Sequence, residues 1–269
     1  MPADLGFTPE ALRASPYAAF WRPALAALPA HVMQAVASGP LAAPLLPPLS
    51  QAGLLLDDGY WPVETGYTVA QDGAVRVFVL TEMPAVSPPM WDWWFAWHGS
   101  ESERYKLWHP GAHVAARWAD GKGETGAYVG RTSVVDEYIG PSLQRFGIGF
   151  VPPAELGLDS ARLTDPARQI CICARGGLPN GRVSMGVLIH HIRAVPGGAE
   201  MRSRFWLGGE NISAPFGWLG ARAAGAIAGM GRAQAADLLV HCAQEMNHLA
   251  AILPAIYAQF GPGEAGRTA

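Results

Sequence analysis

Cysteines, long apolar runs and charged residues are all scarce in this chain. Its 269 residues include three cysteines and 15% charged residues, with a formal net charge of −3. A small, odd number of cysteines after an N-terminus without an apolar signal segment argues against a disulfide framework. No basic run predicts nucleic-acid binding, and no stretch of roughly 18 apolar residues predicts a membrane span. We therefore expect a cytoplasmic protein that binds neither nucleic acid nor membrane.

Hydrophobic and aromatic residues are abundant by contrast. They include ten tryptophans, and hydrophobic residues make up 50% of the chain. This length is enough to bury one large core, or a core and a smaller subdomain. The combination of low charge and many tryptophans fits an aromatic pocket or a buried subunit interface, and it fits a thick aromatic core equally well. Cys171 and Cys173 share one face of an expected strand, and we interpret both as core residues.

Residues 1–60 differ in composition from the rest of the chain. They are rich in Ala, Leu and Pro, and the pattern predicts short helices at Pro9–Ala14 and within Tyr17–Ser38, ended by Gly39 and Pro40. We expect an N-terminal helical arm, followed by a larger, β-rich domain over residues 61–269. Exposed apolar residues on this arm would need cover, so we expect it to take part in a homodimer.

Residues 66–84 predict a hairpin, because two alternating segments flank Asp72 and Gly73. Two short helices are expected next, from Ser87 to Gly99 and from Glu101 to Leu107. The last long helix is expected at about Arg232 to Phe260. Further strands are predicted in the segments HVAARWA, GAYVGRTSVVDEYIG, QRFGIGFV, RQICICARG, VSMGVLIHHIRAV and AEMRSRFWLG.

This order of elements predicts an α+β fold. Strands that follow one another through short turns pair antiparallel. A long C-terminal helix laid across such a curved sheet gives a helix-grip arrangement, with a cavity between the helix and the sheet. A cavity of this kind suits an apolar or aromatic small molecule.

The expected C-terminal helix carries the first candidate metal ligands. His241 and Glu245 are four residues apart, so they share a helix face, and His248 lies on nearly the same face. An isolated pair of this kind is more often a surface pair or a core histidine. Here the surrounding stripe is apolar, and a glutamate there is costly to bury unless it is paired or bound to metal.

Other elements supply further candidates without fixing a choice. His109 and His113 flank a proline turn that leads into a strand, so both rings, one ring or neither would face the cavity. Asp136 and Glu137 alternate along a strand and point to opposite faces, and the pattern does not settle which is inside. His190 and His191 alternate in the same way, so at most one of them lines the cavity.

At this point the sequence resembles a known family. The segments MWDWWFAWHGSESERYKLWHPGAH, VGRTSVVDEYIG, GAEMRSRFWLGG and HCAQEMNHLA resemble those of the 2,4-diacetylphloroglucinol hydrolases, which include phloretin hydrolase. The resemblance covers roughly residues 60 to 255. It implies a zinc-dependent homodimeric hydrolase with a helix-grip fold like that of the pollen allergen Bet v 1. It also implies cleavage of the carbon–carbon bond between an acyl group and a polyhydroxylated aromatic ring, in a small phenolic ketone substrate.

The resemblance also implies a ligand set of two histidines and two glutamates. Three of these fall on His241, Glu245 and Glu137. The fourth falls on one histidine of HPGAH, for which we choose His113, with His109 as the second choice. Tyr105 matches a tyrosine that binds the phenolic substrate, and we expect it to take part in catalysis.

Further roles follow as hypotheses. We expect Trp94 and Trp97 to wall the substrate pocket, and either His190 or His191 to carry a proton during catalysis. Two other functions fit the same fold. One is a carrier that binds an apolar aromatic ligand without metal, and the other is a non-haem iron enzyme, because His and Glu also suit Fe(II). Metal analysis separates the three hypotheses.

Overall fold

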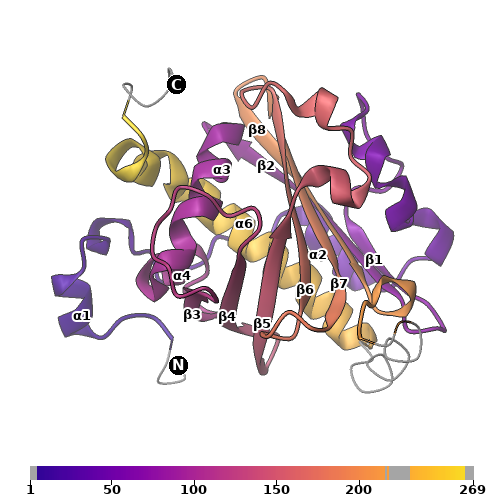
Figure 1. The fold of residues 1–269 in the computed structure, drawn as a ribbon, viewed down its shortest axis with the longest axis horizontal. Coiled ribbons are helices and arrows are strands. Elements are labelled where there is room, and N and C mark those ends of the chain that lie inside the picture. The colour runs from indigo at the N-terminus through magenta and orange to yellow at the C-terminus, as the bar shows by residue number, and fades with distance from the viewer. Residues whose placement is uncertain (1–4, 216, 218–230, 264–269) are drawn as a thin grey trace.

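A single mixed α+β unit is seen in the computed structural model, which describes residues 5–215, 217 and 231–263 (Figure 1). Its centre is an eight-stranded sheet with the strand order β1-β2-β8-β7-β6-β5-β4-β3, and all neighbouring strands are antiparallel. The strands are β1 (Gly66–Val69), β2 (Val75–Pro84), β3 (His113–Trp118), β4 (Thr132–Ile139), β5 (Ser142–Val151), β6 (Gln169–Gly177), β7 (Ser184–Val195) and β8 (Gly198–Leu207).

One long helix crosses one face of this sheet. Figure 1 shows α6 running diagonally across the strands; α4 lies beside β3, and α3 packs against β6, β7 and α6. The α-helices are α1 (Pro9–Ala14), α2 (Ala30–Ser38), α3 (Pro88–Trp97), α4 (Ser102–Trp108) and α6 (Arg232–Phe260). Among the helices described, none combines the length and the hydropathy needed to cross a bilayer.

The hairpin, the two short helices, the later strands and the long helix lie where the sequence predicts them, except that the strand predicted over residues 126–140 begins only at Thr132. Gly73 closes the β1–β2 turn with a φ of 82°, a left-handed backbone conformation that favours glycine. The segment Tyr17–Ser38 differs from the expectation, because only Ala18–Phe20 and α2 are helical within it. Pro23 and Pro29 lie in the gap, and each removes a backbone donor and restricts its neighbour, so the helix cannot run through them.

The two faces of the sheet are buried by different parts of the chain. On the α6 face, Leu239, Met246 and Leu253 are fully buried in a core that includes the tryptophans of α3. On the opposite face, Leu46 and Leu55 pack with a second buried cluster that includes Phe78, Trp206, Cys171 and Cys173. Each buried leucine stabilises the fold by about 2 kcal/mol. Residues 41–56 thus cover the outer face, whereas Tyr17, Phe20 and Val32 belong to the core on the α6 face. Both cysteines are core residues as expected.

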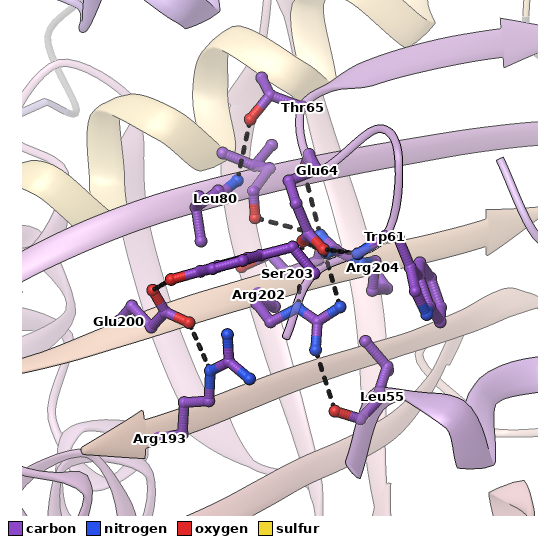
Figure 2. Close-up of polar contacts among 12 residues, drawn as sticks. Leu55, Trp61, Glu64, Thr65, Leu80, Arg193, Glu200, Arg202, Ser203 and Arg204 are labelled. Atoms are coloured by element: carbon purple, nitrogen blue, oxygen red, sulfur yellow. Dashed lines mark hydrogen bonds and ion pairs between the residues drawn. The ribbon is translucent and has the colours of Figure 1, made fainter. Parts of the chain in front are cut away.

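A buried charge cluster fastens this outer layer to the sheet (Figure 2). Figure 2 shows the carboxylate of Glu64, just before β1, meeting the guanidinium groups of Arg202 and Arg204 on β8. Arg202 holds Glu64 through Nε at 3.0 Å and Nη2 at 2.7 Å, and its Nη1 donates to the carbonyl of Leu55. The indole of Trp61 lies beside both arginines. The cluster therefore joins the segment from Leu55 to Glu64 to strand β8, which is distant in sequence.

Candidate metal centre and adjoining cavity

His113 and Glu137 face each other across two neighbouring strands. The chain turns at Pro110 and Gly111 after α4, and His113 begins β3. The antiparallel register places His113 directly opposite Glu137 on β4, next to an irregularity between His113 and Ala115. Directly opposed side chains in such a pair share one face of the sheet, and bulges commonly re-aim side chains beside functional sites.

The hydrogen bonding of His113 fixes which ring nitrogen bears a proton. Nδ1 lies 3.0 Å from the backbone carbonyl oxygen of Tyr105, which only accepts hydrogen bonds, so Nδ1 is the protonated nitrogen. The opposite nitrogen, Nε2, is buried and has no hydrogen-bond partner within the described ranges of the chain. Its lone pair therefore points into the group of acidic residues around it, which is the usual arrangement of a metal-binding histidine.

Helix α6 supplies His241 and Glu245 to the same point. Oε2 of Glu245 lies 3.4 Å from Nε2 of His113 and 3.8 Å from Nε2 of His241. Oε2 of Glu137 lies 3.4 Å and 3.9 Å from the same two nitrogens. His113, Glu137 and His241 each offer one ligand atom within 4.8 Å of the others, and all three are buried. The four residues named by the resemblance thus converge, and three of them form a group able to hold a metal ion.

Burial dominates the electrostatics of this group. It raises the pKa of Glu137 to about 7, although the hydrogen bond from Tyr105 acts to lower it. The pKa of Glu245 is raised well above its usual value by burial and by the neighbouring charge of Glu137. Burial, helped by His109, lowers the pKa of His241 to about 3. Neutral imidazoles thus face carboxyl groups whose pKa values are raised. A bound cation would lower those pKa values and favour the ionised carboxylates.

Tyr105 links this group to the adjoining cavity. Its ring stacks on His113 with centroids 3.8 Å apart and planes inclined by 3°. Its hydroxyl donates a hydrogen bond to Oε2 of Glu137. Burial and the charge of Glu137 raise the pKa of the Tyr105 hydroxyl well above its usual value, so this group stays protonated as a hydrogen-bond donor.

The remaining candidates on α4 and α6 lie beside the group. His109 stacks on His241 with centroids 4.9 Å apart, and its Nε2 lies 3.3 Å from the amide oxygen of Gln244. His248 is buried, and its Nε2 has no partner among the described residues. Asp136 points to the outer face and pairs with Arg145. The structure thus places the carboxylate of Glu137, and not that of Asp136, inside.

A cavity between α6 and the sheet adjoins the ligand group. Its wall combines ligand residues with aromatic, aliphatic and polar side chains: Phe95, His98, Tyr105, Trp108, Ser133, Val135, Glu137, Ile148, Phe150, Leu188, His190, Phe205, Leu238, His241 and Glu245. His190 lines this cavity, with Nδ1 2.8 Å from the hydroxyl of Ser203. His191 points to the other face of the sheet, where Nε2 bonds Gln169 at 2.9 Å. Strand alternation therefore removes His191 from the candidates.

The expected pocket wall of Trp94 and Trp97 is corrected by the structure. Both side chains are buried, but neither lines the cavity. Trp97 is stacked between the rings of Trp93 and Phe260. The guanidinium carbon of Arg104 lies 4.1 Å from the centroid of the Trp97 ring. The rotation of α3 turns Phe95 toward the cavity in their place, and Trp108 of α4 completes the aromatic wall. Helical spacing alone does not show which part of a wholly aromatic helix faces a ligand.

Two polar residues of the cavity were missed by sequence reasoning. His98 follows directly after α3, and its Nδ1 lies 2.8 Å from the carbonyl oxygen of Trp94. Ser133 is buried on β4, and no residue that the structure describes makes a hydrogen bond with its hydroxyl. Two signals were available: His98 follows the aromatic helix, and Ser133 shares the face of Glu137, four residues later on the same strand.

Comparison with known proteins places the chain in a family. The sequence model of the DAPG hydrolase PhiG domain matches residues 45–258. A 2,4-diacetylphloroglucinol hydrolase from a Pseudomonas species is 32% identical, with 93% of this chain and 90% of that protein covered. The same enzyme from Pseudomonas protegens is 32% identical over 93% of this chain and 86% of its own length. Phloretin hydrolase from Eubacterium ramulus is 30% identical over 90% and 89%. The chain therefore belongs to the DAPG hydrolase family.

Proposed function

We propose that this protein is a zinc-dependent hydrolase that cleaves the carbon–carbon bond between an acyl group and a polyhydroxylated aromatic ring. One observation carries the proposal. The unpartnered lone pair of His113 Nε2 lies 3.4 Å from oxygens of both Glu137 and Glu245, beside an aromatic cavity. Lone pairs that converge in a buried site repel one another unless a proton or a cation lies between them. The named activities of the relatives support the substrate class.

Zinc suits the donors that are present. Two imidazole nitrogens and two carboxylate oxygens are ligands that zinc accepts in a tetrahedral site. His113, His241, Glu137 and Glu245 would hold the ion, and Tyr105 would orient Glu137 from outside the ligand set. When bound, zinc supplies Lewis acidity for a carbonyl oxygen and lowers the pKa of water. The same donors also accept Fe(II), so metal analysis is part of the test.

The reaction adds water across the bond between acyl and ring carbons. The acyl carbon gains the oxygen and leaves as a carboxylic acid, while the ring carbon gains a hydrogen. Protonation of the ring carbon first converts the phenol to a keto tautomer, so the ring departs as a stabilised enolate. Tyr105 keeps its single O–H proton, which bonds Glu137 in the free protein; on the cavity wall this hydroxyl would turn from Glu137 to the charge that develops on the oxygen of bound substrate.

His190 is the residue that we propose to move the proton. It lines the cavity wall, and the Ser203 hydroxyl at 2.8 Å orients its ring. Burial lowers the pKa of His190 to about 3, so the free ring is neutral and is suited to receive a proton only while substrate charge is present. Phe95, Trp108 and Phe205 provide the apolar surface that excludes water from the departing ring.

We further propose a helix-grip fold of the Bet v 1 kind for residues 61–269. The antiparallel sheet and the long helix α6 across one face support it. We propose that residues 1–60 form an arm that takes part in a homodimer. Large apolar side chains of this arm remain exposed, namely Met33 at 53%, Leu45 at 47% and Leu54 at 49%. All three cysteines are buried free thiols, which fits our expectation of a reducing cytoplasm.

Two measurements test the proposed function: the metal content of the protein and the products that it releases. Elemental analysis of the purified, untagged protein should find about one zinc per chain, since one ligand group is proposed in each. Incubation with 2,4-diacetylphloroglucinol should then release acetic acid and the monoacyl ring, detected by chromatography. Bound iron would favour the non-haem iron enzyme. Absence of metal after zinc is offered, together with ligand binding but no product, would favour the carrier.

A further inference from the structure

His98 contributes a polar atom to the cavity wall that the proposed reaction does not use. Its ring centroid lies 6.0 Å from that of Tyr105, whose ring stacks on His113. His98 itself is outside the metal-ligand group. It is 2% exposed and faces the cavity beside the tyrosine that contacts Glu137. A ring bound next to Tyr105 would therefore pass close to His98.

The state of His98 is fixed by its backbone contact. The carbonyl oxygen of Trp94 lies 2.8 Å from Nδ1 and only accepts hydrogen bonds, so Nδ1 bears the proton. Burial lowers the pKa of His98 to about 4, although this backbone bond acts to raise it, so the ring is neutral at pH 7. Nε2 is therefore a hydrogen-bond acceptor and cannot donate.

Nε2 of His98 accepts no hydrogen bond from the part of the chain that the structure describes, and the indole N–H groups of its neighbours Trp94 and Trp108 are themselves left without a partner there. The rings around it are those of Trp108 at 5.1 Å, Phe95 at 5.5 Å, Trp94 at 5.6 Å and Tyr105 at 6.0 Å between centroids. The Tyr105 hydroxyl is already directed to Glu137. An acceptor that stays unpaired in an apolar wall opposes binding of any ligand that covers it without donating a hydrogen bond.

We propose that His98 accepts a hydrogen bond from a ring hydroxyl of the substrate and so selects free phenols over their O-methyl ethers. This inference rests on the proposed function and adds the recognition of the ring. A phenol donates one hydrogen bond, which Nε2 needs, whereas a methyl ether has only lone pairs and added bulk. The unpartnered hydroxyl of Ser133 on the same wall both donates and accepts, so it tolerates either group. Glu137, Glu245 and His190 are used by the proposed metal site and proton transfer, so His98 is the acceptor on this wall that is left for recognition of the ring.

The test compares two substrates in two proteins. Phenylalanine at position 98 keeps a ring in the aromatic wall and removes the acceptor. Wild-type protein should hydrolyse an acylphloroglucinol with kcat/KM at least tenfold above that of its mono-O-methyl ether. His98→Phe should lower kcat/KM for the free phenol about 10- to 100-fold and bring the ratio of the two substrates close to one. His98→Asn, whose amide oxygen accepts, should restore part of the ratio.

His191→Phe is the matched control. It makes the same substitution at a buried histidine on the outer face, so it should leave the substrate ratio unchanged. A zinc-loaded His98→Phe protein with the wild-type ratio would overturn the proposal, because loss of packing alone lowers both rates without changing their ratio. A wild-type protein with no preference between the two substrates would overturn it as well.

A binding measurement separates this inference from the proposed function. If the wild-type protein hydrolyses no acylphenol, or if His98→Phe fails to fold, calorimetric titration of wild-type protein uses phloroglucinol and 1,3,5-trimethoxybenzene. Binding of phloroglucinol at least tenfold tighter than the ether supports ring recognition, even without hydrolysis. Equal affinities for the two compounds would contradict it.

Discussion

Nε2 of His113 lies 3.4 Å from a carboxylate oxygen of Glu137, and the proton of the imidazole is on the opposite nitrogen. The two atoms therefore face each other with lone pairs, at a distance too long for a good hydrogen bond. In the metal-free protein a proton on Glu137 relieves this contact. A bound cation relieves the same repulsion when the carboxyl group of Glu137 is ionised. The stability of the metal-free protein and that of the metal-bound protein should therefore depend differently on pH.

The metal-free protein should lose stability as the pH rises. The pKa of Glu137 is about 7 when folded and lies near 4.5 in an unfolded chain, so between these values the folded state binds more protons. Its free energy of unfolding should then fall by about 3 kcal/mol from this residue alone. Thermal unfolding of EDTA-treated protein from pH 5 to pH 8 measures the effect. Added zinc should raise Tm more at pH 8 than at pH 5, and an equal rise at both pH values would argue against carboxylate ligands.

Removal of one ligand should remove most of the metal. Glu245→Gln keeps the shape of the side chain, but a neutral amide is a poor zinc ligand, and His241→Ala removes a nitrogen donor. Both variants should hold well under half of the wild-type zinc after dialysis. Gln244→Ala is the control on the same helix, because Gln244 bonds His109 and contributes no ligand atom to the group. Wild-type metal content in both ligand variants would show that the site lies elsewhere.

Tyr105→Phe should separate catalysis from metal binding. Phenylalanine preserves the stack on His113 at 3.8 Å and loses only the hydroxyl that contacts Glu137. We expect zinc content to stay near the wild-type value, while kcat falls about 100-fold, as on removal of one donor that stabilises developing charge. Steady-state kinetics with matched zinc analysis measures both. An unchanged kcat would restrict Tyr105 to a packing role.

Leu54→Glu tests the proposed dimer without disturbing the core. Leu54 is 49% exposed, whereas its neighbour Leu55 is fully buried on the sheet. A charge at an apolar interface is costly to desolvate, so the variant should sediment as a monomer with its Tm little changed. Truncation of the whole arm is less informative, since it would also uncover Phe78 and Trp206. If the wild type is a dimer and Leu54→Glu has the same sedimentation coefficient, the dimer interface does not include Leu54.

The order of elements and the ends of α6 were predictable because local patterns encode them. Apolar periodicity and flanking glycine place the helix at Arg232–Phe260, and the turn at Gly73 places the first hairpin. Strand register is a tertiary property, so alternation could not choose Glu137 over Asp136. The pairing of β3 with β4 makes that choice by setting Glu137 opposite His113. The four-residue ligand set was available only through resemblance to a family.

The cavity wall was the least predictable part. Whether a residue of an aromatic helix faces a ligand depends on how the helix is rotated against the sheet, and α3 has large apolar side chains on every side. The structure turns Phe95 inward and leaves Trp97 among other rings. His98 was overlooked for a related reason. Its value as an acceptor depends on a backbone bond to Trp94 that no spacing rule specifies.

The Glu64 cluster gives a prediction about stability alone. Burial acts to raise the pKa of Glu64, but Arg202 and Arg204 outweigh it and hold the pKa below its ordinary value. Glu64→Gln would leave two buried guanidinium groups without a countercharge and should cost about 3–5 kcal/mol of unfolding free energy at pH 7. Denaturant unfolding measures the loss. Glu10→Gln, which removes an exposed pair with Arg13, is the control and should change stability by less than about 1 kcal/mol.

The pH dependence of the same variant checks its electrostatic origin. A lowered folded pKa means that the contribution of Glu64 is complete above about pH 4.5 and is lost as the pH falls through the folded value. The gap in unfolding free energy between wild type and Glu64→Gln should therefore narrow on acidification below pH 4.5, because the wild-type carboxyl becomes as neutral as the amide. A gap that stays constant down to acid unfolding would mean that the variant acts through packing, and that the charges of Arg202 and Arg204 are balanced by other groups.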